Sequence, residues 1–138
     1  MASATAGLND FLNSLFHAGT QRTTWYVMLI NNSGYTGLAA GDTMSSHAGW
    51  TEITDYTSAT RLEWTEGAAA GGSIVNSASI TITFNAAVSI KGIALTTDNT
   101  KGGTTGILAT STQWLFPTVR TKASGESIAF TIPIRASI

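Results

Sequence analysis

Hydrophobic and polar residues alternate most clearly over residues 79–95. Apolar residues occupy every second position of residues 80–84, which predicts a strand with one face in a core and the other in water. The alternation resumes over residues 88–90 after a short connection of small residues, so we predict a hairpin. At Gly92 the apolar positions slip by one residue, which predicts a β-bulge there.

Near the start of the chain the apolar residues follow a helical period instead. They fall at i, i+3, i+4, i+7 and i+8 and comprise Leu8, Phe11, Leu12, Leu15 and Phe16. This stripe predicts an amphipathic helix at about residues 7–18, and the small residues 1–6 before it predict a flexible arm. Two interpretations of the helix stay open. It covers one face or end of the β structure, or it docks on a neighbouring subunit.

The remaining pattern predicts further short strands. Residues 23–30 are apolar on both faces, so this strand should be covered on both sides, with the preceding helix as the expected second cover. A loop of about twenty residues follows, and residues 60–65 then place Arg61 and Glu63 on the polar side of a strand. The expected fold is therefore mainly β. We expect a single domain over residues 7–138, an antiparallel β-sandwich or jelly roll of about eight strands with one N-terminal amphipathic helix.

Composition excludes several classes of partner. Hydrophobic residues make up 43% of the chain and charged residues only 11%, and the net charge is -1. We therefore expect no nucleic-acid partner, because such proteins carry a basic surface. No apolar run reaches the length of a membrane-spanning helix, and the first residues lack the basic start of a secretory signal, so we expect no membrane partner and no export by the standard route. The chain has no Cys and thus no disulfide framework.

The sequence offers little catalytic chemistry. His47 lies near Asp42, Ser45 and Ser46, but no nucleophile elbow of the Gly-x-Ser-x-Gly type accompanies them. The two His and eight acidic residues show none of the usual metal-ligand spacings. Four acids could supply paired carboxylates for glycoside hydrolysis, although strand-end positions favour exposure to solvent; these are Glu52, Asp55, Glu63 and Glu66. We expect no enzymatic activity, no metal and no cofactor.

Aromatic side chains leave one binding function open. A groove for stacking on sugars could be lined by Tyr35, Trp50, Tyr56, Trp64 and Trp114. Three of these five are better explained as core or interface residues. If these side chains form an exposed groove, the alternative function is an adhesin module whose partner is a glycan.

Several short motifs resemble one group of proteins. Gly41-Asp42-Thr43 and residues 46–50, followed by Glu52, Tyr56, Arg61 and Trp64, are similar to a segment of small virion proteins of tailed bacteriophages. The stretches LNDFLNSLF and WYVMLI and the later pair Lys91-Gly92 are similar to the same group. The chain departs from the pattern at Glu126, where an Asp is expected after the glycine that precedes the last strand.

The resemblance implies a structural role in the virus particle. It implies a capsid decoration (cement) protein, a homotrimer that bridges neighbouring capsomers, with the major capsid protein and copies of itself as partners. Its expected location is the capsid surface of the virion, after assembly in the host cytoplasm. The alternative within the same resemblance is a phage tail or fibre component, an adhesin module whose partner is a host-surface glycan.

Within this resemblance, residues 42–50 are either a clasp between subunits or an internal lock. In the lock, Asp42 and His47 hydrogen-bond loop backbone and Trp50 fills the core, while Arg61 pairs with Glu52 or Asp42. The complete set of interface or structural-lock candidates is Phe11, Leu15, Phe16, Tyr35, Asp42, His47, Trp50, Arg61 and Trp64.

Overall fold

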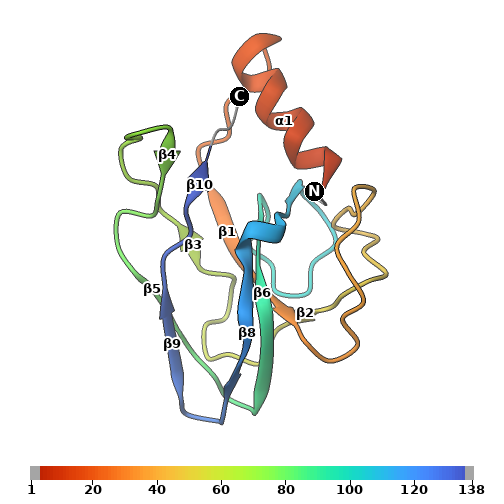
Figure 1. The fold of residues 1–138 in the computed structure, drawn as a ribbon, viewed down its shortest axis with the longest axis vertical. Coiled ribbons are helices and arrows are strands. Elements are labelled where there is room, and N and C mark those ends of the chain that lie inside the picture. The colour runs from red at the N-terminus through yellow and green to blue at the C-terminus, as the bar shows by residue number, and fades with distance from the viewer. Residues whose placement is uncertain (1–3, 136–138) are drawn as a thin grey trace.

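The computed structural model describes residues 4–135 and is mainly β, with one α-helix at the N-terminal end (Figure 1). Its elements are α1 (Thr5–Phe16), β1 (Trp25–Asn31), β2 (Glu52–Ile53), β3 (Glu63–Trp64), β4 (Ser73–Ile74), β5 (Ile80–Thr83), β6 (Val88–Thr96), β7 (Leu108–Ala109), the 3-10 turn η1 (Thr112–Trp114), β8 (Leu115–Lys122), β9 (Ser127–Phe130) and β10 (Ile134–Arg135). The strands pair antiparallel throughout this described range.

The central sheet has six strands built around β1 and β6. Its order is β2-β1-β6-β7, with β3 also pairing with β1 and β8 also pairing with β6. The predicted bulge is confirmed, because the register shifts between Ile90 and Gly92 against β8 and between Ile30 and Asn31 against β1. Glycine is required here: a Cβ on Gly92 would lie 2.8 Å from the Cα of Leu115.

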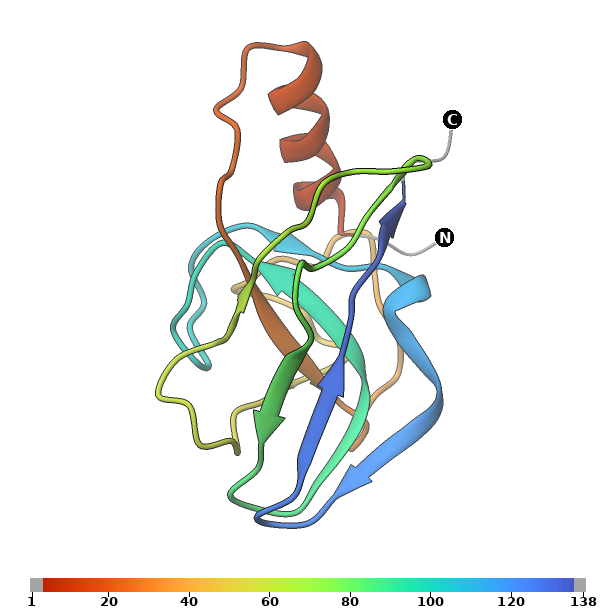
Figure 2. The ribbon, with the colours of Figure 1, turned by 90° about the vertical axis from the view of Figure 1, so that its left-hand side faces the viewer.

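The predicted hairpin between residues 80–84 and 88–90 is wrong. β5 pairs with β9 in a separate two-stranded ribbon, whereas β6 lies in the central sheet (Figure 2). The pairing extends one residue beyond β5. Phe84 N donates to Glu126 O at 2.9 Å, and Gly125 N donates to Phe84 O at 2.8 Å, just before β9 begins. Alternation tells which face of a strand is buried, but it carries no information about the partner strand.

Two clusters of buried side chains lie on the two faces of β1, as the sequence predicts. The first lies between the central sheet and the β5–β9 ribbon and includes Val27, Leu29, Ile82, Leu95 and Ile128. The second includes Ala4, Met28, Ile30, Met44, Trp50, Ala94 and Leu108. The second cover of β1 therefore comes largely from the long loop that follows it, through Met44 and Trp50, and the expectation that α1 supplies it is wrong.

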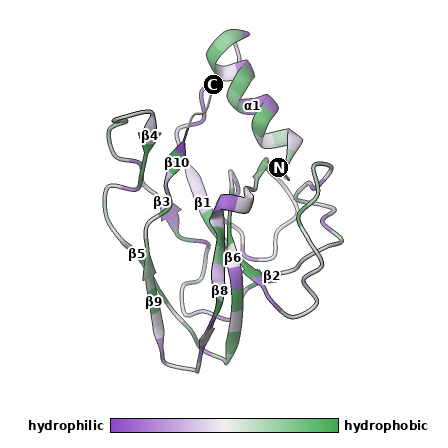
Figure 3. Ribbon diagram, viewed as in Figure 1, coloured by the Kyte–Doolittle hydropathy of each residue, from purple (hydrophilic) through white to green (hydrophobic). Residues whose placement is uncertain are grey.

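The helix α1 projects from one end of the β body (Figures 1 and 2). Its contact with the body is made at its first turn, where Gly7 is the one buried residue of the helix. Figure 3 shows hydrophobic residues along the length of α1. The five residues of the stripe are all exposed, so the interpretation in which α1 uses them to cover the body is wrong.

The predicted flexible arm over residues 1–6 is wrong for the part that the structure describes. Ala4 is buried, and its N donates to Thr110 Oγ1 at 2.9 Å. Thr5 already begins α1, and its N donates to Ala40 O at 2.9 Å. Residues 1–3 lie outside the described residues.

Candidate functional site

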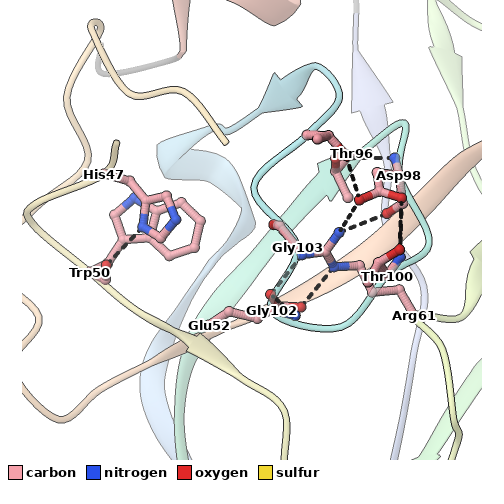
Figure 4. Close-up of polar contacts among 10 residues, drawn as sticks. His47, Trp50, Glu52, Arg61, Thr96, Asp98, Thr100, Gly102 and Gly103 are labelled. Atoms are coloured by element: carbon pink, nitrogen blue, oxygen red, sulfur yellow. Dashed lines mark hydrogen bonds and ion pairs between the residues drawn. The ribbon is translucent and has the colours of Figure 1, made fainter. Parts of the chain in front are cut away.

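The loop over residues 42–50 is closed by contacts within the chain. Asp42 Oδ2 accepts hydrogen bonds from Trp50 Nε1 and Ala39 N, both at 3.0 Å. His47 Nδ1 donates to Trp50 O at 2.9 Å, and the two rings stack with centroids 4.1 Å apart (Figure 4). Trp50 is buried in the second core cluster. These are the contacts of an internal lock, with Asp42 binding the indole as well as loop backbone.

A catalytic triad does not form around His47. Asp42 binds the indole of Trp50, and the described contacts of His47 are with the backbone and ring of Trp50. Ser45 Oγ lies 3.3 Å from Thr43 Oγ1. A triad needs the base to contact both the nucleophile and an orienting acid, and the described contacts provide neither.

A second polar cluster surrounds Arg61, whose side chain is fully buried (Figure 4). Its Nε donates to Glu52 Oε1 at 2.8 Å and its Nη2 to Glu52 Oε2 at 2.7 Å. Arg61 Nη1 donates to Asp98 O at 2.8 Å, and Nη2 donates to Gly103 O at 3.1 Å. Of the two acids expected to pair with Arg61, Glu52 is the partner. The expectation that Arg61 lies on the polar side of a strand is wrong, because β3 begins at Glu63.

This cluster fastens the loop after β6 to β2. Glu52 Oε2 also accepts from Gly102 N at 3.0 Å, so one carboxylate binds both the guanidinium and the loop backbone. A bidentate arginine–carboxylate pair forms only in one relative orientation of the two side chains. Because the pair is buried, separating the two charges would leave each of them without compensation, which is strongly destabilising. The arrangement ties the loop after β6 to β2 through both side-chain and backbone contacts.

Asp98 organises the same loop from inside. Its carboxylate accepts hydrogen bonds from Thr100 N, Thr100 Oγ1 and Thr105 Oγ1, and it lies 3.8 Å from Arg61 Nη1. Desolvation pushes the pKa of Asp98 upward, but the hydrogen bonds from both threonines and the charge of Arg61 outweigh it, so the pKa lies below its usual value. Asp98 therefore stays ionised near neutral pH and can accept these hydrogen bonds within the loop.

Tyr56 lies close to this cluster and is buried, and its phenol oxygen has no hydrogen-bond partner among the described residues. Lys101 Nζ lies 4.3 Å from the centre of the Tyr56 ring and donates to Thr54 O and Tyr56 O. Desolvation by burial and the charge of Glu52 raise the pKa of the Tyr56 phenol, while Arg61 opposes the shift. The phenol therefore remains protonated and cannot serve as a base near neutral pH.

The candidate aromatic residues do not assemble into a groove. Trp50, Tyr56 and Trp64 are buried, which confirms that three of the five belong to the core. Trp64 Nε1 donates to Ile132 O at 3.3 Å. Tyr35 is half-buried under Lys91, whose Nζ lies 5.5 Å from the ring centre.

Other candidate chemistry is also dispersed. Glu52 is bound to Arg61, whereas Glu63 is exposed on β3. Across residues 4–135 no group of three or more metal-ligating acids and histidines gathers in one place. An open depression of about 660 Å³ near the C-terminal end of β8 is lined by polar, charged and aliphatic residues, including Asp55, Val88 and Lys122, without an aromatic side chain.

The surface feature that stands out is the apolar stripe of α1. Phe16 is 81% exposed, and Phe11 and Leu15 are 51% and 58% exposed. These three interface candidates therefore lie together on one helix with Leu8 and Leu12, at the end of the molecule away from the depression. The sequence pattern identified this stripe, although it left open whether the chain itself would bury it.

Sequence reasoning missed the part of the Arg61 cluster that lies after β6. Asp98, Gly102 and Gly103 lie in the loop after β6 and supply contacts to Arg61 or Glu52, yet none of the three is among the candidate residues. An Asp followed two residues later by Thr is a signal for a side-chain-capped turn. That signal predicts local order, but it does not indicate the arginine that lies 37 positions earlier.

No protein-family model matches the chain, and no curated protein has a sequence that matches it. Among the described helices, none is both long and apolar enough to cross a membrane.

Proposed function

We propose that this chain is a bacteriophage virion structural protein, specifically a capsid decoration (cement) protein that binds the outer capsid lattice and stabilises the head. The observation that carries the proposal is the projecting helix α1, whose apolar stripe is exposed while the polar clusters of the body are used internally. Such a molecule offers a surface for binding another protein. The motif resemblance to small phage virion proteins supplies the class of partner.

The proposal includes the finer architecture, a β-sandwich or jelly roll. The first core cluster draws side chains from the central sheet and from the β5–β9 ribbon, including Leu29, Ile93 and Ile128. A core filled from two facing sheets is the defining feature of a sandwich. This architecture suits a rigid body that is repeated over a shell.

The internal contacts of the body support a mechanical role. The lock around Trp50 and the cluster around Arg61 hold two long loops against the sheets. A decoration protein acts through many equivalent contacts, each of which can be modest because the lattice repeats it. Loops that keep one conformation reduce the entropy lost at every one of these contacts.

The proposed partners are the major capsid protein and other copies of this chain, with a homotrimer as the assembled unit on the capsid surface. Glycan binding receives less support. The burial of Trp50, Tyr56 and Trp64 removes three of the aromatic side chains that a sugar-stacking groove would need.

The test is to mix the purified protein with expanded, undecorated capsids of the same virus and to image them by electron cryomicroscopy. The proposal predicts added density at repeated positions of the outer lattice. Bare capsids at saturating protein concentration would reject it. Capsids of an unrelated phage are the control for non-specific adsorption.

A further inference from the structure

The exposed apolar residues of the described chain gather at one end of the molecule. Six large apolar residues of this range are exposed: Leu8, Phe11, Leu12, Leu15, Phe16 and Val75. Five form the stripe of α1, and Val75 follows β4, which lies at the same end of the molecule as α1 (Figure 1). An apolar surface gains stability by meeting another apolar surface. If two copies associate, the stripe of one copy is thus the best match for the stripe of the other.

The helix packs on the body at its first turn, and its last turns are tied to the segment that follows it. At the first turn, Gly7 fits so closely against β7 that a Cβ there would lie 2.8 Å from Leu108 O. Beyond the last turn, Gly19 N donates to Asn13 O at 2.9 Å, and Arg22 Nε lies 3.1 Å from Asp10 Oδ1. The stripe is therefore presented as a pre-organised surface, which lowers the entropic cost of binding.

A helix of this kind needs an apolar partner. α1 has 12 residues, and isolated helices of this length are marginal in water. Helices in proteins gain most of their stability by packing their apolar face, yet the body buries only Gly7 of the described helix. The stripe is the face that is left to pack.

The size and charge of the stripe favour a second copy as this partner. Five side chains that each expose about 100 Å² present roughly 500 Å² of apolar surface, so two copies would bury about 1,000 Å² in total, near the lower limit for a specific interface. The charged residue of α1, Asp10, is paired with Arg22, so the stripe itself is uncharged and makes no demand for a complementary charge. Leu8, Phe11 and Leu15 also have the a, d, a spacing of a helix-pairing seam.

We infer that the apolar stripe of α1 is the surface through which copies of this chain associate, with α1 packing against α1. This inference deepens the proposed function by naming the contact between copies. Its evidence and its test require no capsid.

Light scattering of the purified protein over a range of concentrations tests the inference. The wild-type chain is expected to have a molar mass two or three times the 14.4 kDa of one chain. The double substitution Phe11→Gln and Leu15→Gln keeps good helix formers in α1 but removes the centre of the stripe, and its mass is expected to fall to 14.4 kDa. The matched control is Asn13→Gln, at an exposed polar position of α1, which is expected to keep the wild-type mass.

Two results would overturn the inference: a monomeric wild-type chain at all concentrations, or a double variant that keeps the wild-type mass. If circular dichroism shows that the double variant is unfolded, the single substitution Phe16→Gln decides. It changes the most exposed residue of the stripe and is expected to weaken association about tenfold, whereas unchanged association would refute the inference.

The same samples separate this inference from the proposed function. A chain that associates through α1 but leaves capsids bare supports the inference and overturns the decoration role. A chain that is monomeric in solution but occupies capsid positions supports the decoration role and overturns the inference about α1.

Discussion

Replacing Arg61 with methionine would remove a buried guanidinium and leave its partners in place. The Glu52 carboxylate, whose side chain is 6% exposed, would lose two hydrogen bonds and keep the one from Gly102 N. The carbonyl oxygens of Asp98 and Gly103 would each lose a donor. Breaking a buried ion pair on one side costs about 3–5 kcal/mol, because the remaining charge is left without compensation.

Equilibrium unfolding in urea, followed by intrinsic tryptophan fluorescence, measures this cost. For a chain of this size the loss corresponds to a fall in melting temperature of roughly 10–20 °C. The matched control is Arg22→Met, which breaks an ion pair whose arginine side chain is 43% exposed. Exposed pairs contribute about 1 kcal/mol or less, so the control should unfold close to the wild type.

A double variant tests the physical reason for the loss. Replacing Arg61 and Glu52 together by methionine removes both buried charges, so the double variant should be more stable than Arg61→Met alone. If Arg61→Met costs no more than Arg22→Met, the Arg61 cluster does not fasten the loop and the reasoning is wrong.

Two further predictions concern the bulge and the loop after β6. Gly92→Ala should lower the free energy of unfolding by about 1–3 kcal/mol, because the new Cβ would meet the backbone of Leu115. The control Gly41→Ala has open space around the new Cβ, so the same urea titration should give a free energy of unfolding close to that of the wild type. In thermal melts, Asp98→Asn should be less stable than wild type at pH 6–7. The difference should shrink as pH falls below about 4, because the lowered pKa of Asp98 makes its ionised form stabilising only above that range. A difference that grows in acid would contradict the assignment.

The sequence predicted the elements whose signals are local. The helical spacing of the apolar residues predicted α1, and the run that is apolar on both faces predicted β1. The one-residue shift of the apolar positions at Gly92 predicted the bulge. Each of these signals lies within one element and depends on which of its faces is buried. The prediction of a mainly β chain follows from the same kind of signal.

Long-range pairing was not available from such signals. β5 pairs with β9, with Thr83 opposite Ser127, although β6 is the next strand along the chain. The burial of Arg61 depends on Glu52 and on the loop after β6, and neither the charge pattern nor the strand pattern specifies that meeting. The exposure of the α1 stripe likewise depends on how the long loop fills the second core, which leaves no face of β1 for the helix.

The number of copies bound to each expanded capsid at saturation is the most direct test of a decoration role. Quantitative density analysis of purified, protein-loaded capsids gives this number as the protein concentration is raised. A decoration protein should reach a plateau at a fixed number of copies for each repeating unit of the lattice. Binding that never reaches a plateau, or no binding at all, would contradict a decoration role.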